Sequence, residues 1–226
     1  GFRKSRSRYN VNNLTANVTA KVGEKNEWRF FLNGFTEYSD TPGGLSQAQW
    51  EQDPEQSVNP HDFFEARRFS TVILYKCSFD ETNSLTTSIY GSYLKRDWWL
   101  DNRNADPTKR KFTSALRDIP TVGLFSDYER TNTLFGKENK LLAGIRLHTD
   151  ITHEVSVAGD EMGKKAGKTT ANSANTVAVV EGYVFDEFHI TDKLNINPGL
   201  RYTFVNYDKE DYFRNNWDNR NEDAFI

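Results

Sequence analysis

Leucine, alanine and valine occupy every second position of a segment near the start of the chain, Asn13–Val22. The positions between them carry asparagine, threonine and lysine. Because successive side chains of a β-strand point to opposite faces of the sheet, this alternation predicts a strand with one apolar and one polar face. The segment is longer than the usual globular strand of about 5–6 residues. It matches the length of about 9–11 residues that a strand needs to cross a membrane in a β-barrel.

Similar segments recur along the chain and predict about eight antiparallel strands. Clean alternation returns at Leu141–His148 and at Leu200–Val205. Five further segments are rich in β-branched and aromatic residues but carry apolar side chains at both odd and even positions. Their residue types predict strands but do not indicate which face is apolar, and the five segments are Trp28–Tyr38, Phe69–Lys76, Leu85–Arg96, Thr121–Arg130 and Val177–His189.

The polar breaks between these segments alternate between short and long. The short ones lie at Gly23–Glu27, Ser78–Asn83, Thr131–Asn139 and Thr191–Lys193, and the long ones at Ser39–Ala66, Asp97–Pro120, Glu154–Ala174 and from Asp208 to the end. Short periplasmic turns and long extracellular loops are typical of outer-membrane barrels, whereas a soluble sandwich has loops of mixed length at both ends. We therefore predict an all-β fold, an antiparallel transmembrane β-barrel segment of about eight strands.

The composition favours the same fold class. Only 36% of the 226 residues are hydrophobic and 27% are charged, which is little apolar material for the core of a soluble domain of this size. A membrane barrel needs an apolar residue only at every second strand position. The 16 Phe, 10 Tyr and 5 Trp argue against disorder, and the net charge of −3 argues against a strongly basic nucleic-acid-binding protein. The single cysteine, Cys77, excludes an intrachain disulfide and a cysteine-based zinc site.

Three stretches give the chain a family resemblance. They are Thr41–Ser46 with the downstream Asp62, Phe64 and Ala66–Arg68, then Leu142–Asp150, and finally Glu181–Phe188 followed by Leu194–Tyr202. Their order and spacing resemble the barrel of TonB-dependent outer-membrane receptors, nearest the branch of ferric dicitrate and siderophore receptors. The resemblance extends from about Tyr9 to Tyr207, and so covers nearly the whole chain.

The resemblance implies a receptor that binds a ferric chelate, ferric citrate or a siderophore complex, and takes it up across the outer membrane of a Gram-negative bacterium. It implies no enzyme activity, no resident cofactor and no metal site. The implied partners are the chelate, the TonB energy-transducing complex acting through an N-terminal region, and outer-membrane lipid and lipopolysaccharide, with no nucleic acid. The sequence contains no segment like the family's plug domain. We therefore expect residues 1–226 to be one partial β-barrel domain, without the plug and the remaining strands.

Ferric citrate and many siderophore complexes are anionic, as the resemblance implies, and the planar guanidinium of arginine binds carboxylates through two parallel hydrogen bonds. Arginines at the loop bases and in the upper lumen are therefore the candidate ligand-binding residues, together with two tryptophans that could stack on a flat chelate ring. The predicted set is Arg67, Arg68, Arg96, Trp98 and Trp99. Arg103 and Arg110 are weaker candidates, and we expect Arg146 and Arg201 to form ion pairs with acidic residues of the wall.

The residues show no catalytic set. His148 and Asp150 share a face of their predicted strand, while His153 falls on the other, which disfavours a metal site there. Two alternatives remain open to the sequence. One is a complete small outer-membrane barrel of eight strands with a structural or adhesive role, and the other is a soluble β-sandwich that binds carbohydrate or protein.

Overall fold

One antiparallel sheet makes up nearly the whole of the computed structural model, which describes residues 6–101, 111–159, 161–191 and 193–213 and the backbone of residues 224–225. The described residues include one short helix, α1 (Gln47–Gln52), which lies between the second and third strands. No helix in the described residues is long and apolar enough to span a membrane. The strands are β1 (Tyr9–Val22), β2 (Asn26–Asp40), β3 (Phe63–Ser78), β4 (Asn83–Asp101), β5 (Phe112–Leu134), β6 (Lys137–Gly159), β7 (Gly167–Thr191), β8 (Leu194–Ile196), β9 (Gly199–Asp211) and β10 (Ala224–Phe225).

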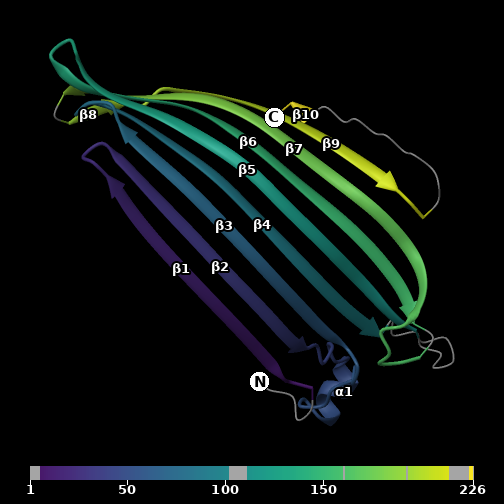
Figure 1. The fold of residues 1–226 in the computed structure, drawn as a ribbon. Helices are drawn as coiled ribbons and strands as arrows, with labels where there is room; N and C mark the ends of the chain where they lie inside the picture. The colour runs from purple at the N-terminus through teal and green to yellow at the C-terminus, as the bar shows by residue number, and fades with distance from the viewer. Residues whose placement is uncertain (1–5, 102–110, 160, 192, 214–223, 226) are drawn as a thin grey trace.

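From β1 to β7 the strands follow one another through the sheet in chain order, so that each pairs with its sequence neighbours. β8 and β9 both pair with β7, and Pro198, which has no N–H to donate, lies between them. Taken as one interrupted strand they complete the set of about eight that the sequence predicts, and the fold class is confirmed. Figure 1 shows the sheet bent into an open trough, with β1 at one edge and β9, paired over two residues with β10, at the other. Within the described residues β1 pairs with β2 alone, so the sheet does not close on itself as a complete eight-stranded barrel would.

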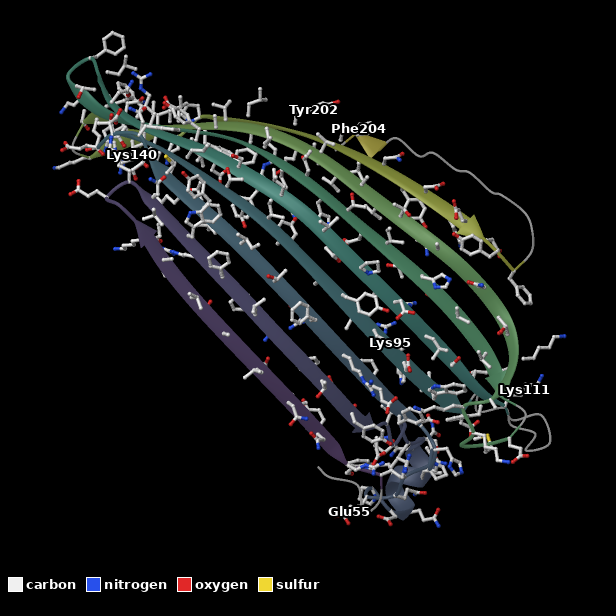
Figure 2. All side chains as sticks on the ribbon, in the orientation of Figure 1. Glu55, Lys95, Lys111, Lys140, Tyr202 and Phe204 are labelled. Atoms are coloured by element: carbon white, nitrogen blue, oxygen red, sulfur yellow. The ribbon has the colours of Figure 1, made fainter. Side chains whose placement is uncertain are left out.

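The connections differ in length at the two ends of the sheet, as predicted. A two-residue turn joins β5 to β6 through Phe135 and Gly136, both with positive φ (53° and 77°), as is favoured in two-residue hairpins. In Figure 2, Lys140 marks this end, and Glu55 and Lys111 mark the opposite end, where the long connections lie.

The strands extend further into the polar stretches than predicted. β5 and β6 have 23 residues each and β7 has 25, so the long loop expected at Glu154–Ala174 is wrong for most of its length. At about 3.3 Å per residue, 25 residues span roughly 80 Å, far more than an apolar band of about 25 Å requires even in tilted strands. Backbone pairing needs no apolar side chains, and the polar continuation of each strand therefore left no alternation to detect.

The register shows which face each side chain occupies. Val18 is opposite Phe30, and Phe30 is opposite Ile73, so one face can be followed across the sheet. We call this the apolar face, and the other the polar face. The apolar face carries most of the exposed large hydrophobic residues, including Leu14, Val18, Phe30, Leu32, Phe69, Ile73, Ile89, Val122, Ile145, Leu147, Val180, Val184, Leu200, Tyr202 and Phe204.

Little of this apolar surface is buried within the chain. The buried hydrophobic residues of the described part are Phe63, Ala66, Trp99 and Phe112, all near the long connections. Tyr202 and Phe204 of β9, labelled in Figure 2, are exposed on the same face as Leu14 and Val18 of β1. The apolar residues of this chain therefore form an exposed band on one face of the sheet and not an interior core.

The β3–β4 turn is stabilised by one carboxylate. Asp80 accepts hydrogen bonds from the backbone and hydroxyl of Thr82 (both 2.7 Å) and from the backbone of Asn83 (2.9 Å). The side-chain amide of Asn83 also donates to it (2.8 Å). These donors favour the ionised form, the Thr82 hydroxyl most strongly, and lower the pKa of Asp80 to about 2.

Asp80→Ala should destabilise the protein in a pH-dependent way. The pKa of Asp80 is about 2 in the folded protein and about 3.9 in an unfolded chain. Its stabilising effect is therefore fully present above about pH 4 and is lost as the pH falls through about 2. Urea unfolding of the protein should show a wild-type advantage at pH 6 that vanishes near pH 2. Glu81→Ala is the control, and an equal effect of the two substitutions would contradict this role of Asp80.

Candidate functional site

Three arginines of adjacent strands lie on the polar face toward the end with the long connections. Arg68 comes from β3, Arg96 from β4 and Arg117 from β5. The register places Arg96 opposite Arg117, and Arg68 opposite Leu94, which is two residues before Arg96 on the same face. Arg117 is not among the residues predicted from the sequence, because it falls in the stretch Asp97–Pro120, which was expected to be a long loop. That expectation is wrong at both ends of the stretch, since β4 extends to Asp101 and β5 begins at Phe112.

Of the facing pair Arg96 and Arg117, Arg117 alone forms an ion pair with a carboxylate of the described residues. The Arg117 Nε donates to Glu154 Oε2 at 2.7 Å, across the β5–β6 pair. The Arg96 Nε is buried and has no hydrogen-bond partner among the described residues. Two guanidinium groups with a single acidic partner leave an excess positive charge, and a buried donor without an acceptor carries a desolvation cost. An anion bound at Arg96 would relieve both.

The Arg68 side chain lies against the wall of the sheet. Its guanidinium carbon is 5.5 Å from the centroid of the Phe35 ring. A terminal nitrogen of the same guanidinium group donates a hydrogen bond to Asn33 Oδ1 at 3.4 Å. Asn33 is buried and is itself fixed by a 2.6 Å hydrogen bond to Asn13. This chain of contacts through β1, β2 and β3 orients the guanidinium without neutralising it.

Two of the predicted pairs are split between the faces. Arg67 and Arg68 are consecutive in β3, so Arg67 projects from the apolar-face side, away from Arg68 and Arg96. Trp98 and Trp99 are split in the same way. Trp98 lies on the polar face with 38% of its surface exposed, whereas Trp99 lies on the other side and is 2% exposed.

Trp99 belongs to a small packed cluster at the bases of the long connections. Its ring centroid is 5.1 Å from that of Phe112, which is 6.4 Å from that of Phe63. We call Phe63, Trp99 and Phe112 the loop-base cluster; its partly buried neighbours are Tyr38, Leu116, Val157 and Met162. A ligand could stack on Trp99 only if this packing opened. Of the two tryptophans, Trp98 is therefore the one whose ring a ligand can reach.

A hydrogen-bonded chain crosses the polar face beside the arginines. Tyr90 Oη is 2.9 Å from His148 Nδ1, and His148 Nε2 is 2.7 Å from Asp150 Oδ2. The Thr121 hydroxyl donates to the other oxygen of Asp150. As expected, His148 and Asp150 share a face and His153 occupies the other, where it bonds to Asn172 at 2.8 Å. Tyr90 and Thr121 lie on neighbouring strands, a proximity that sequence spacing did not indicate.

The remaining arginines have lesser roles at this surface. Arg201 pairs with Glu181 at 3.8 Å, the wall ion pair that the sequence predicted, while Arg146 stands opposite Glu181 in the register. Arg103 and Arg110 lie outside the described residues. The part of the chain that the structure describes contains no group of three or more His, Cys, Asp or Glu residues placed to hold a metal ion.

Comparison with solved structures shows the fold to be that of a section of the barrel of ferric-chelate receptors. The ferric citrate transporter FecA in its unliganded form superposes with a TM-score of 0.87 over 98% of this chain, at 18% identity. The ferric preacinetobactin receptor BauA and the siderophore receptor PiuA, both from Acinetobacter baumannii, each have a TM-score of 0.75, at 9% and 12% identity. These matches cover 96% and 98% of this chain.

The chain spans only about a third of the proteins that it resembles. The match covers 32% of FecA, 36% of BauA and 39% of PiuA. No family model matches the sequence.

The two tryptophans should respond differently to truncation. Trp99→Ala removes a buried ring from the loop-base cluster and should cost about 3–5 kcal/mol locally. Trp98→Ala removes a part-exposed ring and should change stability by about 0.5 kcal/mol or less. Native-state hydrogen exchange of the peptides that contain Phe63 and Phe112, followed by mass spectrometry in the full-length protein, measures this difference. Equal protection in the two variants would show that Trp99 does not stabilise the loop bases.

Proposed function

We propose that this chain forms part of the barrel wall of a TonB-dependent outer-membrane receptor that takes up an anionic ferric chelate. The observation that carries the proposal is the division of one sheet into two faces. One face exposes a continuous apolar band, and the other presents Arg68, Arg96 and Arg117 near the long connections. The likeness to FecA, BauA and PiuA supports the same assignment.

The apolar face is proposed to contact lipid. Val18 is 58% exposed and Leu200 71% exposed, although they belong to opposite edges of the sheet. Exposed apolar surface of this extent is unfavourable in water and is expected where hydrocarbon is the solvent. Residues 1–226 would then be one partial barrel domain, with the short turns in the periplasm and the long connections outside the cell.

The polar face is proposed to line the lumen and to capture the chelate. Arg96 offers a buried donor without a partner, Arg68 a guanidinium oriented by Phe35 and Asn33, and Trp98 a ring surface. Carboxylate groups of ferric citrate would suit this set, because arginine binds carboxylates through paired hydrogen bonds. Arg67 and Trp99, also predicted from sequence, face away from it.

Binding and transport, without bond chemistry, are the activity that this surface supports. The solved structures that share this fold include a ferric citrate transporter and two siderophore-related receptors. Energy from the TonB complex would act through an N-terminal region, as the family resemblance implies, and the chelate would be cargo and not a resident cofactor.

Removing the arginines should weaken uptake of an anionic chelate. Loss of a charge-assisted hydrogen bond costs about 1.5–3 kcal/mol, so Arg68→Ala and Arg96→Ala should each raise the half-saturating concentration by roughly tenfold or more. Cells that produce the full-length receptor would be given ⁵⁵Fe-labelled ferric citrate. Lys76→Ala, on the polar face of β3 near the short turns, is the control. Unchanged uptake in both arginine variants would remove these residues from the site.

The membrane assignment has its own test in β1. Val18→Arg puts a charge on the apolar face and should cost about 2–4 kcal/mol if that position is near the bilayer centre. Thr19→Arg, one residue further on the polar face, should cost little. Both variants of the full-length protein would be refolded into phospholipid vesicles and unfolded with urea. A similar loss of unfolding free energy in the two variants would contradict lipid contact at Val18.

A further inference from the structure

The connection between β6 and β7 reaches across the sheet to β3. Lys165 Nζ lies 2.8 Å from Glu65 Oε2, an ion pair between residues 100 positions apart in the chain. The same ammonium group lies 4.6 Å from the centroid of the Phe63 ring. Because β4 and β5 separate β6 from β3 in the sheet, this contact spans the ends of two strands. We call residues 161–166 of the connection the clasp.

Met162 gives the clasp an apolar anchor. It packs against the loop-base cluster of Phe63, Trp99 and Phe112, whose members are at most 7% exposed. The thioether of methionine is polarizable and flexible, so it makes favourable contacts with aromatic rings of irregular arrangement. Figure 1 shows the connection at the end of the sheet where β4 ends and β5 begins, as this packing requires.

The clasp also lies close to the connection between β2 and β3. Gly163 has a φ of 79°, which glycine adopts without strain, and a Cβ built there would lie 2.9 Å from His61 Nδ1. Asp62, the residue after His61, is 1% exposed and accepts a hydrogen bond from the backbone N–H of Asp101 at 2.7 Å. The clasp, the β2–β3 connection and the end of β4 are therefore held together.

These contacts are on the face of the sheet opposite the candidate chelate site. Phe63, Glu65 and Trp99 project from the apolar-face side of β3 and β4. Arg96 and Trp98 occupy even positions of β4 and project from the polar face. Both sets of side chains share one strand backbone. Contacts that fix the backbone from one face therefore also fix the points from which Arg96 and Trp98 extend.

The two strands end close to these residues. β3 begins at Phe63 and β4 ends at Asp101, a short distance beyond Trp98. Strand ends open locally at little cost in free energy unless packing holds them. A side chain that is already ordered loses less conformational entropy when it binds a ligand than a mobile one does. Ordering of this strand end from the opposite face would therefore strengthen chelate binding.

We propose that the clasp positions Arg96 and Trp98 for the chelate, and that Met162 and Lys165 are the positioning residues. The proposal rests on the function proposed above, because it concerns the affinity of the same site. It adds that a connection on the opposite face of the sheet sets this affinity without touching the ligand. The effect is on binding of the chelate and not on the step driven by the TonB complex.

The chain offers a matched pair of neighbouring lysines for the test. Lys165 reaches β3, whereas Lys164 forms its ion pair with Glu161 inside the clasp. Arg67 and Lys95 line the same small cavity as Glu65 and Lys165, and they offer Glu65 alternative partners. Lys165→Ala is therefore combined with Met162→Ala, so that the charged and the apolar contacts are lost together.

Cells that produce the full-length receptor would be given ⁵⁵Fe-labelled ferric citrate. Met162→Ala, Lys165→Ala should raise the half-saturating concentration by about three- to tenfold, with the maximal rate per receptor unchanged. Lys164→Ala should behave as the wild type does. The conservative double variant Met162→Leu, Lys165→Arg should restore the wild-type value, because it keeps one apolar and one cationic contact.

A second measurement does not depend on uptake. Amide hydrogen exchange in the purified full-length receptor, followed by mass spectrometry, reports local opening of the peptides that contain Arg96 and Trp98. Exchange there should be faster in Met162→Ala, Lys165→Ala than in Lys164→Ala.

Three results would overturn the proposal. They are a wild-type half-saturating concentration in Met162→Ala, Lys165→Ala, a fall in its maximal rate alone, and exchange at Arg96 and Trp98 equal to that of Lys164→Ala. The second would assign the clasp to the energised step. Absence of ferric citrate uptake by the wild-type receptor would instead contradict the proposed function, so the two failures are distinguishable.

Discussion

Continuous antiparallel pairing in one register is the constraint on which the rest of this structure depends. Because each strand pairs with the next over most of its length, the face of a single residue such as Val18 determines the faces of Phe30 and Ile73 beside it. Side chains alternate strictly along a strand, so a slip of one residue between two strands would move every apolar side chain of one strand to the wrong face. The ladder thus converts an alternation that is clean only in β1 and parts of β6 and β9 into an apolar band that crosses the whole sheet.

The same constraint places consecutive residues on opposite faces of the sheet. Arg68 lies against Phe35 on the polar face, while Arg67 projects beside Lys95 on the other. In our account the first faces the chelate and the second faces away from it. Trp98 and Trp99 are divided similarly, one available on the polar face and one packed into the loop-base cluster. A residue pair that looks like one site in the sequence is therefore divided between the two sides of a single layer.

Sequence reasoning predicted the fold class, the number of strands and the difference between the two ends, because these follow from local alternation and turn residues. It did not predict strand length, since the polar ends of β5, β6 and β7 are stabilised by backbone pairing that leaves no hydropathy signal. It placed His148 and Asp150 together because they are two residues apart, and missed Arg117, Tyr90 and Thr121, whose positions depend on cross-strand register. The apolar faces of β2–β5 and of β7 likewise could be assigned only from the register.

The central claim is that the apolar face meets lipid and the polar face meets water. Nitroxide labels on β4 test this claim directly. They would be placed one at a time from Ile89 to Tyr93, in the full-length receptor that carries Cys77→Ser and is reconstituted in vesicles. The measurement is the accessibility of each label to oxygen and to a water-soluble nickel chelate. Oxygen should dominate at Ile89, Gly91 and Tyr93, and the nickel chelate at Tyr90 and Ser92, with a period of two residues. Uniform accessibility, or the opposite phase, would contradict the account.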